Sequence, residues 1–163
     1  MIFQKYKLFW KMHNNGKTIV DLPYSEDGDY YSYLKKWYDQ GYRQVIVSSE
    51  IMLELISDYV VDKRLILYEI NFAEEDEELV HEINHYLAQL TKKPSIIVKL
   101  LNKLRFSCDE SSIDMKRIYF KGCIDNFYIA MFIQSNGIIG ISQDSYDYFF
   151  PEICTRIQRS ILG

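Results

Sequence analysis

The chain has 163 residues, a net charge of −4 and a sequence pI of about 5.4. This length is typical of one domain with a sizeable core, and the acidic balance disfavours a dedicated DNA-binding protein. No Gly-rich nucleotide-binding fingerprint occurs in a chain with only seven glycines.

Alternation and turn signals predict a hairpin at the N-terminus. Apolar and polar residues alternate in Phe3–Trp10, and the chain returns over Thr18–Leu22. Asn15-Gly16 suits a type I′ turn, whose two central residues need positive φ angles. A second pair, Asn136-Gly137, separates two apolar segments and predicts a second hairpin.

The rest of the chain shows helical and strand patterns. Strands are expected over residues 43–47, 63–72, 115–121, 127–134 and 138–142, and helices over about 29–40, from Ser48 or Ser49, over about 74–91, from Pro94 and from Pro151. The strand-helix-strand order of 43–72 allows one right-handed parallel crossover. The sequence therefore predicts a single α+β domain over 1–163, with a mixed, mostly antiparallel sheet and about five helices.

The most conspicuous motif is His81-Glu82-Ile83-Asn84-His85, which has the pattern H-E-x-x-H and contains two of the three histidines. At this spacing two helical histidines lie on one face and can bind zinc, with the glutamate as general base. The segment resembles the zincin metallopeptidases. That resemblance implies that His81 and His85 hold zinc, that Glu82 activates a metal-bound water, and that a third ligand follows downstream.

A helical wheel supports a different interpretation of the same segment. At about 100° per residue, the apolar side chains gather on the side opposite both histidines. These apolar residues are Leu79, Val80, Ile83, Leu87 and Leu90. A solvated helix has the same pattern. The downstream candidates for a third ligand, Asp109, Glu110 and Asp114, stand in a polar loop, and His13 lies far away in the sequence. We therefore rank zinc binding second.

An acidic run precedes this motif. It consists of Glu74, Glu75, Asp76, Glu77 and Glu78. Acids at the start of a helix complement the helix dipole, and an exposed acidic cluster can also steer a basic partner. Tyrosine, which is enriched at protein interfaces, occurs 14 times. The aromatic clusters are Tyr30, Tyr31, Tyr33, Tyr38 and Tyr42, followed by Tyr146, Tyr148, Phe149 and Phe150.

These features lead to two hypotheses of different classes. The first is a non-enzymatic acidic protein-binding module without a cofactor, in its concrete form an immunity or antitoxin-type inhibitor of a basic toxin, with residues 74–78 contacting the partner. The second is a zinc-dependent, metallopeptidase-like hydrolase that uses His81, Glu82 and His85. A weaker third hypothesis, nucleic-acid binding, rests on lysine-rich segments 5–17 and 92–105, which are more typical of solvated faces.

The sequence also suggests a location. The N-terminal segment carries lysines among its apolar residues and lacks a small-residue cleavage site, which disfavours a secretory signal. The longest apolar run, Phe127–Ile133, is too short to span a bilayer. Three widely spaced cysteines form no C-x-x-C pair. We therefore expect a cytoplasmic protein without a membrane partner.

Overall fold

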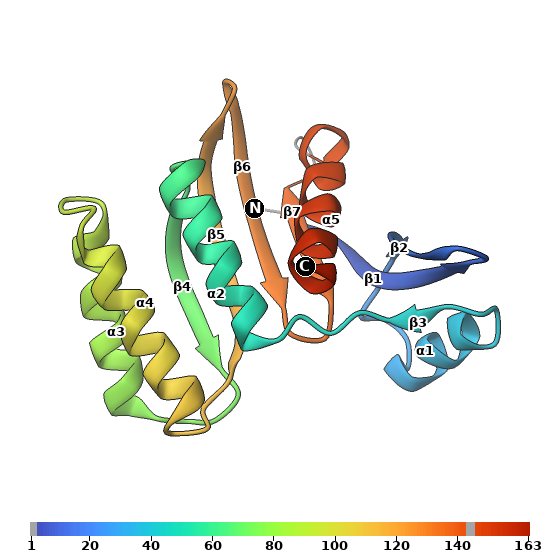
Figure 1. Ribbon diagram of the computed structural model, residues 1–163, viewed down its shortest axis with the longest axis horizontal. Coiled ribbons are helices and arrows are strands. Elements are labelled where there is room, and N and C mark those ends of the chain that lie inside the picture. Colours follow the sequence, from blue (N-terminus) through green and yellow to red (C-terminus); the bar gives the residue numbers. More distant parts are fainter. Residues whose placement is uncertain (1–2, 143–145) are drawn as a thin grey trace.

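The computed structural model describes residues 3–142 and 146–163, except for the side chain of Tyr146. Within these residues the structure has seven strands, five α-helices and one short π-helix, η1 (Figure 1). In chain order these are β1 (Phe3–His13), β2 (Gly16–Pro23), α1 (Tyr30–Tyr38), β3 (Arg43–Gln44), α2 (Ser49–Ser57), η1 (Asp58–Asp62), β4 (Ile66–Phe72), α3 (Glu77–Leu90), α4 (Ile96–Asp109), β5 (Met115–Ile124), β6 (Phe127–Gln134), β7 (Ile138–Ser142) and α5 (Tyr146–Leu162).

Six strands form one sheet in the order β2-β1-β7-β6-β5-β4. The seventh, the short strand β3, also pairs with β1. All pairings between the described strands are antiparallel, which confirms the α+β class and the mostly antiparallel sheet. The predicted parallel crossover within 43–72 is wrong. β3 pairs antiparallel with β1, through Phe9 opposite Gln44, and the next backbone donor, Val45 N–H, also bonds to β1, at Leu8 O (3.2 Å).

One face of the sheet carries the core. Strand residues that alternate along β4 to β7 point to this face, including Ile70, Phe120, Met131 and Ile139, each at most 5% exposed. Helices α2 and α5 lie over this face, and the α3–α4 pair flanks β4 (Figure 1). Helix α1 lies on the other side of β1, where Tyr33 contacts Phe9. None of the described helices is long and apolar enough to cross a membrane.

The hairpin turns differ from the Asn-Gly prediction. The turn between β1 and β2 consists of Asn14 and Asn15, neither of which has a positive φ, so Asn15-Gly16 is not a type I′ turn. The β6–β7 connection has three residues and ends on Gly137 in the left-handed region (φ 81°). The pair with two positive φ angles is Asp125-Asn126 (50° and 70°), between β5 and β6. Asn and Asp tolerate this region better than other side chains do.

The last helix begins earlier than predicted. Helix α5 starts at Tyr146 and contains Pro151, which the sequence placed at the helix start. Phe149 and Phe150 are 3% and 2% exposed. Burying these two rings against the sheet favours the additional turn and offsets the helical hydrogen bond that Pro151, the sixth residue of α5, cannot donate.

Candidate functional site

The five predicted partner-contacting acids lie where β4 leads into α3. Asp76 is the N-cap of α3, and its carboxylate accepts a hydrogen bond from Leu79 N–H at 3.0 Å. Glu74, Glu75, Glu77 and Glu78 are exposed. Among the described residues, none of the five takes part in an ion pair. Asp76 therefore stabilises the helix, while the carboxylates of the four glutamates are exposed to solvent.

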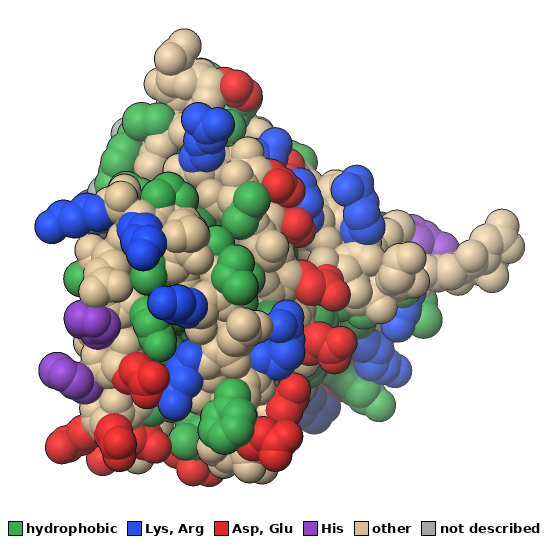
Figure 2. Space-filling model, turned by 60° about the vertical axis from the view of Figure 1, so that its left-hand side comes forward, with side chains coloured by type: hydrophobic (Ala, Val, Ile, Leu, Met, Phe, Trp, Pro, Cys, Tyr) green, Lys and Arg blue, Asp and Glu red, His purple; other side chains and the backbone are tan. Residues whose placement is uncertain are grey.

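The tertiary structure brings further acids to the same end. The segment 107–114 consists of the last turn of α4, which ends at Asp109 rather than in the predicted loop, and the loop that follows it. It lies beside the start of α3, where Ala73 N–H donates to Asp114 O at 2.9 Å. Asp109 and Glu110, which are exposed, belong to this segment. A shallow hollow of about 200 Å³ is lined from both segments, by Glu78 and Ser111 among others. In Figure 2, acidic side chains gather along the lower edge of the molecule. We call residues 74–78 with Asp109 and Glu110 the acidic end.

The H-E-x-x-H segment lies in the middle of α3. Leu79, Ile83, Leu87 and Leu90 are buried, and both histidines are exposed, as the helical wheel predicts. Val80 is an exception, because 38% of its surface is exposed. The His85 ring hydrogen-bonds Gln89 one turn further along the same helix, at 3.0 Å.

The described residues around this segment do not include a complete set of ligands for a catalytic zinc ion. Such an ion takes three protein ligands and one open position. In the described part of the chain, no three His, Cys, Asp or Glu side chains are grouped so as to hold a metal. Asp114, one candidate third ligand, accepts a hydrogen bond from Ser49 at 3.0 Å. The Glu82 carboxylate lies 3.0 Å from Lys103 Nζ, so this glutamate already has a cationic partner.

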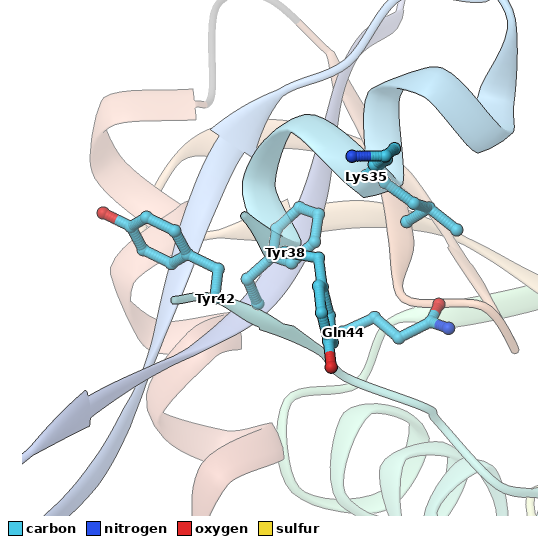
Figure 3. A pocket seen from close by; sticks show the side chains of 6 residues that line it. Lys35, Tyr38, Tyr42 and Gln44 are labelled. Carbon is cyan, nitrogen blue, oxygen red and sulfur yellow. The ribbon is translucent and has the colours of Figure 1, made fainter. Parts of the chain in front are cut away.

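The first tyrosine cluster forms a separate surface around α1 and β3. A hollow of about 270 Å³ lies between them, with Lys35 and Tyr38 coming from α1 and Gln44 from β3 (Figure 3). Tyr31 and Tyr38 are 78% and 58% exposed. The guanidinium of Arg43 lies 3.9 Å from the centre of the Tyr38 ring.

The other aromatic residues of the two clusters are mostly structural. Burial raises the pKa of Tyr33 to about 12, and its hydroxyl donates to Pro23 O at 2.8 Å. In the second cluster, Phe149 and Phe150 belong to the core, and Tyr148 hydrogen-bonds Asp125. The side chain of Tyr146 lies outside the described residues.

A row of aromatic rings that no local sequence pattern indicated crosses the sheet face opposite α2 and α5. It runs from Tyr68 through Tyr119 and Phe132 to Phe3, with ring centroids 5.7, 5.8 and 5.4 Å apart. The Arg117 guanidinium lies 4.5 Å from the Phe132 centroid. Tyr119 and Phe132 lie in segments that the sequence predicts as strands, but the register of these strands was needed to place the two rings beside each other.

The chain matches no family model, no curated protein and no solved structure. The acidic end differs from the other two surfaces in how its charges are paired. The tyrosine surface and the ring row are held by contacts within the chain, whereas the four exposed glutamates have no described cationic partner. Like charges held close together repel, and a cationic partner relieves this repulsion.

Proposed function

We propose that this protein is a non-enzymatic binding protein whose acidic end docks onto a basic surface of another protein. The observation that supports this most is the absence of described ion pairs at Glu74, Glu75, Glu77 and Glu78, on a surface that Asp109 and Glu110 extend. Such a surface steers a basic partner and rejects acidic ones.

In its concrete form, we propose an immunity or antitoxin-type inhibitor that covers the basic active site of a toxin. No cofactor is required for this role. We place it in the cytoplasm, a reducing compartment, because Cys108, Cys123 and Cys154 are free thiols.

A charge-neutralised variant tests the proposal. It combines Glu74→Gln, Glu75→Gln, Glu77→Gln and Glu78→Gln, and keeps Asp76 because that residue caps α3. A control with the same change in charge replaces four exposed acids elsewhere. These substitutions are Asp27→Asn, Glu54→Gln, Asp62→Asn and Asp147→Asn.

Affinity capture from the native host, followed by titration calorimetry with the purified partner, gives the measurement. The native chain and the control should retain a stoichiometric basic protein, and the charge-neutralised variant should bind it about tenfold more weakly or worse. The affinity of the native chain for this partner should decrease when the salt concentration is raised from about 50 to about 300 mM at constant pH. Equal binding by the two variants, or recovery of no stoichiometric partner, would refute the proposal.

A further inference from the structure

An apolar groove of about 610 Å³ lies at the end of the helix layer away from the acidic end. Its walls come from four segments: η1, the start of β4, the C-terminal end of α3 and the start of α4. Its apolar lining includes Val60, Val61, Ile66, Leu90, Pro94 and Ile97. On the upper part of the face in Figure 2, hydrophobic side chains lie among lysine and arginine side chains.

The path of the chain from α2 to β4 keeps this groove open. The π-helix η1 is closed by Lys63 N–H donating to Asp58 O at 3.2 Å, and Arg64 then takes a left-handed conformation with φ 58°. This conformation costs a non-glycine residue about 1 kcal/mol. It places Leu65 in the core while Val61 stays 53% exposed. The neighbouring strand residue Ile66 is 37% exposed, so apolar surface faces the groove without a covering segment among the described residues.

The groove lining has few polar side chains, and its charge is positive. Arg64 is its charged residue, and the structure gives it no ion pair or side-chain hydrogen bond to any described residue. Thr91 adds a hydroxyl, and no acid is part of the lining. The adjacent Lys63 and Lys92 are exposed. An arginine guanidinium is always charged and is well shaped for a carboxylate.

We propose that this groove binds a free aliphatic carboxylate, with the chain along the apolar wall and the head group against Arg64. The volume lies in the range of small-ligand sites, and an apolar lining with one or two polar groups is their usual composition. The cation fixes the sign of the head group, and the valine, isoleucine and leucine side chains of the wall favour a flexible hydrocarbon over a polar ligand. This proposal is independent of the acidic end.

Titration of the full chain with decanoate, below its micelle concentration, tests the site by calorimetry and by amide chemical shifts. Saturable one-to-one binding is expected, with shifts at residues 60–66 and 90–97. Octanoate should bind roughly tenfold more weakly, because two fewer methylenes are buried. Decanol, which has no charge, should bind more weakly than decanoate. Absence of saturable binding, or shifts elsewhere, would overturn the assignment.

Two pairs of variants separate the head-group contact from the apolar wall. Arg64→Gly suits the left-handed backbone, so it should fold, and it should weaken decanoate about three- to tenfold while leaving decanol unchanged. The control is Lys36→Gln on α1, which also removes one exposed cation. It should change the affinity for neither decanoate nor decanol. Val61→Asp should weaken decanoate more than Val61→Asn does, because only the first adds a repelling carboxylate. Equal decanoate affinity in Arg64→Gly and the native chain, with both folded by thermal melting, contradicts the proposal.

Discussion

The carboxylate of Glu82 and the ammonium of Lys103, 3.0 Å apart, join the H-E-x-x-H segment of α3 to α4. Both side chains are partly exposed, so solvent screens the pair. We expect a double-mutant cycle of Glu82→Gln and Lys103→Met to give a coupling below about 1 kcal/mol. Urea unfolding of the four proteins measures it. A coupling above about 2 kcal/mol would show that the pair is more strongly desolvated than its exposure indicates.

The two exposed histidines of α3 should contribute little to stability. His81→Ala and His85→Ala should each change the free energy of unfolding by less than about 0.5 kcal/mol, as surface substitutions usually do. Equimolar zinc should leave the melting temperature of the native chain unchanged, because the described residues supply no third ligand. One bound zinc per chain that either substitution releases would revive the zinc hydrolase hypothesis.

Lys7 should make stability depend on pH in the alkaline range. Its side chain is fully buried, its ammonium donates to Asn136 O, and burial lowers its pKa to about 8. Below pH 8 the lysine is charged in both states, so the cost of burying the charge is present in full. Between pH 8 and about 10.5 the folded state releases the proton before the unfolded state does, so stability rises, by up to about 3 kcal/mol.

The variant Lys7→Met isolates this effect. Urea unfolding at several pH values should show a rise from pH 8 to 10.5 in the native chain relative to Lys7→Met. The difference is needed because burial raises the pKa of Tyr33 to about 12, and tyrosines that ionise first in the unfolded state lower stability above pH 10. Parallel pH profiles for the two proteins would contradict the assignment to Lys7.

The close contact between Gly140 and Phe132 should make Gly140 intolerant of a side chain. A Cβ atom at Gly140 would lie 2.0 Å from Cε2 of Phe132, a ring that is 3% exposed. Gly140→Ala must displace this ring, and we expect a loss of about 1–3 kcal/mol in thermal or urea unfolding. Gly28→Ala is the control, because a Cβ there meets no heavy atom within 4 Å. Equal effects at the two positions would contradict the packing of Phe132 on Gly140.

The two-residue turns offer a test that compares the same residue type at opposite signs of φ. Asn126 has φ 70°, whereas Asn14 does not have a positive φ. A β-branched side chain is strained in the left-handed region, so Asn126→Val should lose about 1–2 kcal/mol of stability and Asn14→Val much less. Asn126→Gly should be neutral or stabilising. Chemical denaturation of the three variants measures the order, and a more damaging Asn14→Val would show that the turn types are assigned the wrong way round.

Local patterns in the sequence determined much of this structure. The apolar stripe of α3 predicted the burial of Ile83 and Leu87 and the exposure of His81 and His85, because side chains on one helix have a fixed angular relation. The apolar segments 115–121, 127–134 and 138–142 likewise predicted strands β5, β6 and β7. Local patterns failed at α5. They predicted that the helix begins at Pro151, whereas the burial of Phe149 and Phe150 extends it to Tyr146.

What only the tertiary structure decided is which distant segments meet. The chain itself placed five acids in one run, and the packing of segment 107–114 beside them added Asp109 and Glu110. Strand register aligned Tyr68, Tyr119, Phe132 and Phe3, which come from four of the five strands between β4 and β1. The left-handed conformation of Arg64 helps to open an apolar groove. Helix and strand periodicities act within one element, whereas contacts between elements depend on how the whole core packs, and no short pattern specifies that.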